Sequence, residues 1–477
     1  MRIRTGLLTA GAAVAAGCLV LTGCIGQSPA SSGNTDTQLN STAKDVTLSI
    51  SSNSIVGGKN DSGARWITQY VVPAFTQMEK AKGVTVHITF NGDGSDDGSY
   101  QQKQVLALRT GGGGDILEID GTLVGDYAES GFIKPLSGVV GQNEVSGWPG
   151  WNQIAKSVQQ LDEYKGQAYG VPIGTDGRVL YYNKTLFAQA GLPADWQPKS
   201  WADIISAAQA LKKLPGVTPI QIDGGTAMTE TTTVNGFLPM LAGAGQLLYG
   251  NGKWQGNTAA MRAALGFYQQ IFAQGLADPV LDEEAQGRDQ SFAEFAANKI
   301  GIYSESDYMW RSILSPTVGN DKMADRDSAV GYALIPAQTP GSGTDGQSFV
   351  SYSGGGVRLI NPHTKYPQQA WDLLTFMASA PAIEVYENQY LGGATQITGN
   401  TTVDSKLLAG DPLLKFISTK AIPDTHFRPS EGDYTQVSAL VQQATADVIS
   451  GKSPADAAAT YATALAKAVG QANVVNN

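Results

Sequence analysis

YGVPIGTDGRVLYYNK occupies residues 169–184, and its pattern decides how the rest of the chain is interpreted. Two runs, 171–173 and 179–182, are typical of β-strands. The residues between them are too polar for the centre of a buried strand, and they do not form the two-residue turn of a tight hairpin. They include an acid and a base, Asp176 and Arg178. Taken alone, this middle is a surface loop that carries a solvated ion pair.

Length and charge limit the classes of protein to consider. The chain has 477 residues, of which 42% are hydrophobic and 16% charged, so it can fill two or more cores. Its formal net charge is −10. A nucleic-acid partner would require a basic face, so we expect none. The acidic surface favours uncharged or cationic ligands over polyanions.

The N-terminus has the form of an export signal. Two arginines precede an apolar run at 6–21, which resembles a signal peptide and is short for a membrane span. The sequence LTGC that follows resembles a bacterial lipobox. We therefore expect 1–23 to be a lipoprotein signal peptide and Cys24 to be lipidated; the alternative is cleavage after small residues beside an incidental cysteine. The other cysteine, Cys18, lies in the signal, which leaves no disulfide.

Strand-like and helix-like segments alternate after a polar stretch at 24–44, which we expect to be a flexible tether. The period-2 and period-3.6 patterns predict strands at 45–51, 83–90, 115–119, 300–303, 330–335 and 357–360. They predict helices at 65–82 (kinked at Pro73), 100–109, 201–214, 259–274, 292–298, 367–378, 434–450 and 454–468. This alternation indicates an α/β fold with a mostly parallel sheet.

Five blocks follow one another in a specific order. They are GGGGDILEIDGTLVGDYAESGFIKPLS (111–137), YKGQAYGVPIGTDGRVLYYNKTLFAQAGL (164–192, followed by KSWADI), FAEFAANKIGIYSESDYMW (292–310), YSGGGVRLINPHTKYPQQAWDLLTFMAS (352–379) and SGKSPADAAATYATALAKA (450–468). In this order, behind a lipobox, they resemble the extracellular solute-binding proteins of ABC importers, in the group that takes sugars and oligosaccharides. The resemblance covers most of the chain from residue 45 onward.

The resemblance implies a two-lobed periplasmic-binding-protein-like α/β fold with strands that cross between the lobes. It implies a first lobe of 45–173 plus about 357–412 and a second of about 179–353 plus about 413–472. Segment 171–182 is then a crossover, which leaves the first lobe near residue 173 and enters the second near residue 179, and Asp176 and Arg178 face a ligand cleft. The expected protein is a monomer that is lipid-anchored on the extracytoplasmic face of the cell membrane, binds a carbohydrate without a cofactor and delivers it to ABC permease subunits.

Candidate contacts in the first lobe follow predicted strands or open the next helix. Asn53 ends the first strand and Asp120 ends the third, where open α/β sheets place ligands; each has capping as its rival role. Trp66 either stacks on a sugar ring or packs on the sheet. The polar insert at 56–63 departs from many members of the family and puts these contacts in doubt.

Candidate contacts in the second half depend more on the resemblance. Trp310 matches the position where the family commonly places an aromatic platform for a sugar ring, and Tyr308 lies beside it. The alternative for Trp310 is burial under the second lobe. Four further candidates are Gly354 and Gly355, which permit close backbone approach, and Arg428 and Tyr434 near the start of a late helix.

Metal and enzyme motifs are weak or missing. Asp93, Ser95, Asp97 and Gly98 fit the first half of an EF-hand loop, but Gln104 stands where the bidentate Glu belongs, so we expect no metal. Three histidines and no GxSxG, HExxH or Walker A pattern argue against an enzyme. Two alternatives stay open: a surface-anchored two-carboxylate glycoside-processing enzyme, and the same fold with a non-sugar solute.

Overall fold

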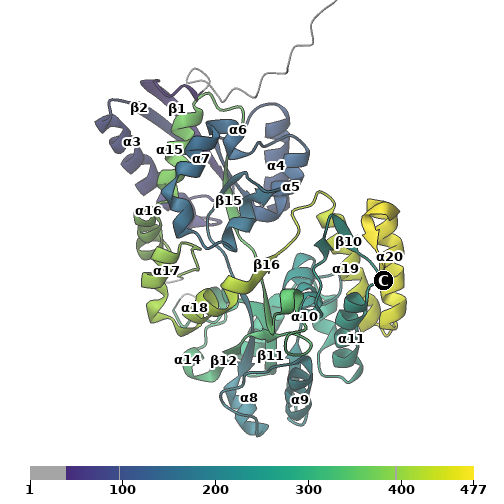
Figure 1. The fold of residues 1–477 in the computed structure, drawn as a ribbon. Coiled ribbons are helices and arrows are strands. Elements are labelled where there is room, and N and C mark those ends of the chain that lie inside the picture. The colour runs from purple at the N-terminus through teal and green to yellow at the C-terminus, as the bar shows by residue number, and fades with distance from the viewer. Residues whose placement is uncertain (1–38, 96, 318, 393–394, 477) are drawn as a thin grey trace, which may run out of the picture.

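A computed structural model of the protein describes residues 39–95, 97–317, 319–392 and 395–476. The expected signal peptide, Cys24 and most of the expected tether lie outside these residues. The chain forms two lobes, stacked one above the other in Figure 1, and each is built around its own β-sheet. Within the described ranges, no helix combines the length and apolar composition needed to cross a bilayer.

The first lobe surrounds a five-stranded sheet. In spatial order its strands are β2 (Thr85–Gly92), β1 (Asp45–Ser52), β3 (Ile116–Asp120), β15 (Gly356–Ile360) and β6 (Gly170–Pro172). β1 alternates as predicted, with Val46, Leu48 and Ile50 fully buried. It pairs in parallel with β2 and β3, so the carboxyl ends of these strands lie at the same edge.

Helices cover both faces of this sheet. They are α2 (Asp61–Trp66), α3 (Val72–Ala81), α4 (Asp97–Arg109), α5 (Val124–Glu129), α6 (Leu136–Val140), α7 (Gln142–Gly147), α15 (Pro367–Met377) and α16 (Ala380–Val385). A π-helical turn, Ile67–Val71, lies between α2 and α3 just before Pro73, and the kink expected at Pro73 stays a prediction. Proline lacks the N–H that would continue the helical ladder, and a π-turn accommodates the interruption.

The second lobe surrounds a four-stranded sheet of order β12 (Val330–Ala333), β7 (Arg178–Asn183), β11 (Ile300–Ser306) and β8 (Thr218–Gln221). All six residues of β7 are buried. Val179 and Tyr181 pack in a core continuous with the first lobe, whereas Leu180 and Tyr182 pack in the second lobe's own core. β7 is therefore a central strand covered on both faces, which explains its unbroken apolar run.

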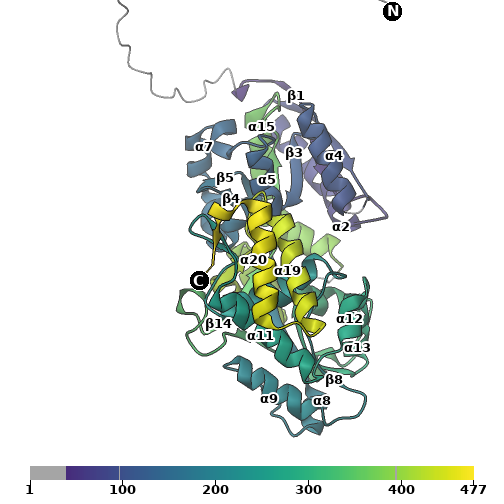
Figure 2. The same ribbon diagram turned by 90° about the vertical axis from the view of Figure 1, so that its right-hand side faces the viewer.

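The helices of the second lobe are α8 (Lys184–Gln189), α9 (Trp201–Leu211), α10 (Leu238–Gly243), α11 (Ala259–Ala273), α12 (Pro279–Glu283), α13 (Gly287–Ala296), α14 (Arg326–Ala329), α19 (Tyr434–Ile449) and α20 (Pro454–Val469). Figure 2 shows α19 and α20 side by side, with α11 beneath them. Two short helices, α17 (Thr401–Leu407) and α18 (Pro412–Phe416), lie at the junction of the lobes (Figure 1).

Short strands complete the structure. β14 (Phe349–Ser353) lies between β13 (Ile335–Pro336) and β16 (Thr425–Phe427). β10 (Lys253–Gln255) lies between β17 (Val474–Val475) and β9 (Tyr249–Gly250), and β4 (Glu163–Tyr164) pairs with β5 (Gln167–Ala168).

The chain passes between the two large sheets after β6 and again after β14. The connecting residues are 173–177 and 354–355. Each sheet contains one strand that runs against the others, β7 in one and β15 in the other, and each is the strand that follows such a passage. A strand that enters a sheet from the junction runs away from the junction, whereas the neighbouring strands run toward it. The predicted mostly parallel sheet is therefore confirmed, with one reversed strand in each lobe. The passages fall near the predicted lobe boundaries, whose full course stays a prediction.

Packing begins before the predicted first strand. The side-chain amide of Asn40 donates to the Lys365 carbonyl at 3.2 Å, and Gln369 donates to the Asn40 carbonyl at 3.1 Å. Leu39 is buried. The end of the expected tether is thus held against the start of α15.

Candidate functional site

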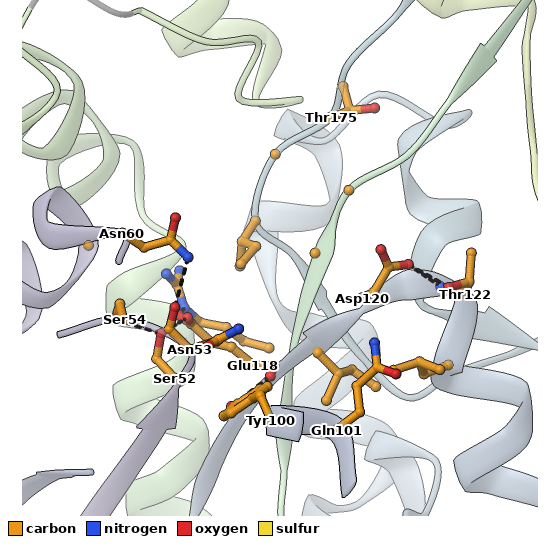
Figure 3. A pocket seen from close by; sticks show the side chains of 18 of the residues that line it. Ser52, Asn53, Ser54, Asn60, Tyr100, Gln101, Glu118, Asp120, Thr122 and Thr175 are labelled. Carbon is orange, nitrogen blue, oxygen red and sulfur yellow. Dashed lines mark hydrogen bonds and ion pairs between the residues drawn. The ribbon is translucent and has the colours of Figure 1, made fainter. Parts of the chain in front are cut away.

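A cavity of about 730 Å³ lies between the lobes. This volume is within the range of pockets that hold small molecules. Its walls come from the carboxyl ends of β1 and β3, the starts of α2 and α4, both passages, and the segment before α19. Figure 3 shows the first-lobe wall, with Asp120 and Thr122 on one side and Asn53 and Asn60 on the other.

Glu118 and Arg358 form a fixed pair in this wall. They face each other across β3 and β15, and Arg358 Nε lies 2.6 Å from Glu118 Oε1. Ser52 donates to the other carboxylate oxygen at 2.5 Å. The Arg358 guanidinium lies 5.0 Å from the centroid of the Trp66 ring, whose indole N–H donates to the Ala382 carbonyl. Trp66 is thereby fixed, with 2% of its surface exposed.

Arg428 joins the two lobes. Its guanidinium lies 3.3 and 3.4 Å from the Asp120 oxygens in the first lobe and 3.4 Å from Glu230 Oε1 in the second. Asp120 also caps the turn Gly121–Leu123, accepting from the backbone N–H and the hydroxyl of Thr122 at 2.9 and 2.6 Å. Glu230 accepts from the hydroxyls of Tyr434 and Ser438.

Asp176 stands where the two passages touch. Its Oδ1 accepts from the Gly354 N–H at 2.6 Å and from the Arg178 guanidinium. Burial acts to raise the pKa of Asp176, but the neighbouring guanidinium and this N–H outweigh it and hold that pKa below its ordinary value. Close approach of the passages requires glycine at 355, because a Cβ there would lie 2.3 Å from the Gly174 carbonyl oxygen.

The predicted site residues divide into two groups. Those that line the cavity are Asn53, Trp66, Asp120, Asp176, Gly355, Arg428 and Tyr434. Those that do not line it are Arg178, Tyr308, Trp310 and Gly354. Arg178 is buried behind Asp176, and Gly354 contributes its backbone N–H to that carboxylate. The ring of Tyr308 lies beside the guanidinium groups of Arg288 and Arg311. Of these two arginines, Arg311 lines the cavity.

Trp310 is buried under the second lobe, which was the alternative to its expected role as a platform for a sugar ring. Only 3% of its surface is exposed, and its indole N–H donates to Asp411 Oδ2 at 2.8 Å. The Arg326 guanidinium covers its ring at 3.7 Å from the centroid. This tryptophan therefore packs the second lobe against α18, away from the cavity.

Several lining residues were not predicted from the sequence, and they include Ser52, Asn60, Tyr100, Glu118, Glu230, Arg311, Arg358 and Tyr386. A signal existed for Glu118 and Arg358, since each is a charged residue inside an apolar strand run. No comparable signal marks Tyr386 or Glu230. The 56–63 insert does reach the site, because Asn60, Ser62 and Gly63 border the cavity.

Carboxylates outnumber guanidinium groups among the described lining residues. The acids are Glu118, Asp120, Asp126, Asp176 and Glu230, and the bases are Arg311, Arg358 and Arg428. Each of these arginines already has a carboxylate partner: Arg311 Nε lies 2.9 Å from Asp307 Oδ2, and the other two pairs are described above. Burial, with Glu129 and Asp433 nearby, raises the pKa of Asp126. Among the lining residues that the structure describes, the cavity thus offers many hydrogen-bond acceptors and no guanidinium without a carboxylate partner.

Metal binding finds no support in the described part of the chain, where no three acidic, histidine or cysteine side chains group suitably. In the loop that resembles half an EF-hand, the Asp93 carboxylate is taken by Lys103 at 2.7 Å and by the Ser95 N–H at 2.7 Å.

Comparisons with known proteins define the class. Residues 60–384 match the sequence profile of the bacterial extracellular solute-binding protein family, so the chain belongs to that family. A putative binding protein of Brucella abortus (strain 2308) is 24% identical over 407 residues, which cover 83% of this chain and 90% of the relative. The sn-glycerol-3-phosphate-binding periplasmic protein UgpB of Escherichia coli K12 is 30% identical over 118 residues, 24% of this chain and 27% of UgpB.

Solved structures share the two-lobed fold. An ABC transporter solute-binding protein from Thermotoga lettingae TMO, bound to α-D-tagatose, matches with a TM-score of 0.64 at 23% identity over 89% of this chain and 99% of its own. The cyclic α-maltosyl-1,6-maltose binding protein of Arthrobacter globiformis matches with a TM-score of 0.65 at 18% identity, over 90% and 100%. These relatives are described as binding proteins, not as enzymes.

Proposed function

We propose that this protein is the substrate-binding component of an ABC carbohydrate importer, and that it holds an uncharged sugar or oligosaccharide in the cavity between its lobes. The observation that carries the proposal is the composition of that cavity: acceptor-rich, and with every lining guanidinium already paired to a carboxylate. Sugar hydroxyls are donors that match such acceptors, and hydrogen bonds to charged groups contribute about 1.5–3 kcal/mol each. The tagatose and cyclic maltosyl-maltose ligands of the solved relatives are of this chemical class.

Individual contacts follow from position. In this proposal Asp120 and Asp176 accept hydrogen bonds from ligand hydroxyls, Asn53 and Arg428 donate, and Tyr434 lines the far wall. Trp66 exposes too little of its ring to act as a broad stacking platform. Closure of the lobes around the ligand would exclude water and create a distinct shape that a permease can recognise.

A glycerol-phosphate ligand is the second candidate, because of the 118-residue similarity to UgpB. A phosphate group is typically bound by free guanidinium, ammonium or backbone N–H groups. Here an entering phosphate would lie beside Glu118, Asp120 and Asp307, which already pair with the lining arginines, and displacing the buried Asp307 would leave an unpaired buried carboxylate. We therefore favour an uncharged saccharide over glycerol phosphate as the ligand.

Anchoring and assembly belong to the proposal as well. Lipid on Cys24 would hold the protein at the extracytoplasmic face of the cell membrane, and a monomer would deliver its ligand to the permease subunits of the importer. The lobe boundaries inferred from the sequence are kept in this proposal.

Calorimetry on a ligand panel tests the function. The panel is maltose, maltotetraose, D-tagatose, ribitol and glycerol 3-phosphate, each titrated into the protein without residues 1–23. We expect saturable binding of at least one uncharged member, no binding of glycerol 3-phosphate, and recovery of the intact sugar by chromatography. Binding of glycerol 3-phosphate alone would favour the second candidate, and a hydrolysed oligosaccharide would identify a glycoside-processing enzyme.

A further inference from the structure

Arg178 stands at the start of β7, directly behind Asp176. Only 6% of its surface is exposed, and it does not line the cavity. Its Nη1 donates to Asp176 Oδ1 and, at 3.2 Å, to the Tyr352 carbonyl, while its Nε donates to Asn235 Oδ1 at 3.0 Å. These bonds point the guanidinium into the protein, so a ligand in the cavity meets Asp176 and not Arg178.

Asn235 fixes Arg178 from the other side. It is 1% exposed, and its Nδ2 donates to both oxygens of Glu305 at 3.2 and 3.1 Å and to Asp223 Oδ2 at 3.2 Å. Because both of these partners are carboxylates, the amide nitrogen must face them, which leaves Oδ1 to accept from Arg178. Glu305 is held in turn by Arg288 at 2.7 and 2.9 Å. A continuous polar chain therefore runs from the interior of the second lobe to the cavity wall.

We propose that Arg178 is a positioning residue for ligand recognition: it fixes the Asp176 carboxylate in one orientation through Oδ1, so that Oδ2 is presented to the solute. The inference rests on the proposed function, since it takes Asp176 as a ligand contact. Arginine suits this task because its planar fork donates in two directions at once, to Asp176 and to Asn235. A lysine ammonium at the end of a flexible stem can satisfy one of these partners but not the whole geometry.

The charge of Asp176 depends on the groups that face it. They are Arg178 on its own segment, Arg428 before α19, and the Asp307–Arg311 pair that follows β11. Burial and Asp307 favour the neutral carboxyl, whereas the arginines favour the carboxylate. Without the Arg178 guanidinium, the pKa of Asp176 rises. On acidification the carboxylate is then protonated at a higher pH than in the unaltered protein, and binding that needs the carboxylate is lost there.

Four variants test the inference: Arg178→Gln, Arg178→Lys, Asp176→Asn and the double variant Arg178→Gln/Asp176→Asn. Arg326→Gln is the matched control, because Arg326 is also a largely enclosed arginine, with 12% of its side chain exposed against 7% for Arg178, stacked on Trp310 and outside the cavity lining. Affinity for the saccharide that the unaltered protein binds is measured by calorimetry from pH 4 to pH 8. Urea unfolding without ligand is measured over the same range.

We expect Arg178→Gln to weaken binding by about tenfold or more, a factor that corresponds to about 1.4 kcal/mol, because a misoriented Asp176 loses a charged hydrogen bond to the solute. Its acid limit of binding should move to higher pH, and Arg178→Lys should recover part of the affinity. In the Asp176→Asn background, Arg178→Gln should have little further effect. Arg326→Gln should lower stability and leave the affinity unchanged.

Distinct results separate failure of the inference from failure of the function. If no saccharide binds to the unaltered protein, the proposed function fails. The unfolding data then still test the structural premise of the inference, which requires coupling between positions 178 and 176 that weakens as the pH falls. Equal effects of Arg178→Gln with and without Asp176, or an unshifted acid limit, would overturn the inference. If Arg178→Gln does not fold, Arg178→Lys supplies the same comparison.

Discussion

Paired charges set the character of the cavity at the scale of single residues. Arg358 is fixed by Glu118, Arg311 by Asp307, and Arg428 by carboxylates from both lobes. Such pairs hold donors and acceptors in place before a ligand arrives, which reduces the ordering cost of binding. The side chain of Asp120 remains 41% exposed, so it can still accept from a ligand.

Replacement of Trp310 should affect folding rather than binding. Trp310→Ala removes a buried indole, its bond to Asp411 and the surface on which Arg326 stacks. Substitutions of this kind cost about 3–5 kcal/mol of unfolding free energy. Urea unfolding should show this loss, while calorimetry shows an unchanged affinity. A large fall in affinity at equal stability would instead restore Trp310 as a ligand contact.

Glu387 gives a pH-dependent prediction. It is 3% exposed, and burial raises its pKa to about 7 from an ordinary 4.5. The folded protein therefore holds a proton there that the unfolded chain releases near pH 4.5, so this group makes the unfolding free energy fall as pH rises from about 4.5 to 7. Glu387→Gln should remove the effect. Relative to the unaltered protein, the variant should gain up to about 3 kcal/mol between pH 4.5 and 8 in urea unfolding. A pH-independent difference would contradict the assignment.

Sequence patterns predicted part of the cavity lining, because the ends of strands can be located from periodicity. Asn53 and Asp120 were found in this way, and both lie at the cavity. Tyr386 and Glu230 were not, because their approach depends on how distant segments pack. Trp310 was chosen from a family resemblance, which specifies a position in the chain and not the direction of a side chain.

Element boundaries were predicted most closely where the hydrophobic period is long and regular. α11, α15, α19 and α20 end within one residue of their predicted bounds, and β1 extends one residue further. The sequence predicts one helix at 65–82, whereas the structure has a π-helical turn between α2 and α3. The hydrophobic pattern continues through this region, but Pro73 cannot donate a backbone hydrogen bond. Strands of two or three residues, such as β13 and β16, carry too little pattern to be recognised.

The segment between β16 and α19 binds the second lobe to the first through a tight contact with α5. A Cβ on Gly125 would lie 1.3 Å from the Ser430 carbonyl oxygen. Gly125→Ala should therefore displace this segment, lower the unfolding free energy by about 1–3 kcal/mol as overpacking does, and weaken ligand binding by moving Arg428.

Gly138→Ala is the matched control for that change. Gly138 lies in α6 of the same lobe, and a Cβ there meets nothing within 4 Å. Alanine in a helix should leave binding unchanged and alter stability by no more than about 1 kcal/mol, in the favourable direction. Similar losses for both variants in urea unfolding and calorimetry would mean that the loss in Gly125→Ala does not arise from the contact with Ser430.

The whole molecule is expected to change shape when it binds. The lobes are joined by the two short passages and by the chain between α16 and α19, and they can rotate about these connections. The saccharide that binds should therefore reduce the radius of gyration in small-angle X-ray scattering. Glycerol 3-phosphate at the same concentration serves as the control and should leave the curve unchanged. An identical curve with a saturating saccharide would show that recognition does not use closure.

Membrane attachment is tested outside the described residues. Cys24→Ala should move the expressed protein from the membrane fraction to the soluble fraction, because one acylated residue is the only membrane contact that we propose. The variant, once purified, should bind its ligand as the unaltered protein does. Retention of Cys24→Ala in washed membranes would point to a different mode of attachment.

The contact of Asn40 with α15 has a practical consequence for instrument design. It lies beside the amino end of β1, whereas the carboxyl end of β1 borders the cavity, roughly 26 Å away for eight extended residues. A sensor chip or fluorescent bead coupled on the amino-terminal side would therefore leave the mouth of the cavity unobstructed and the second lobe free to rotate, so immobilised protein should report the same dissociation constant as protein in solution.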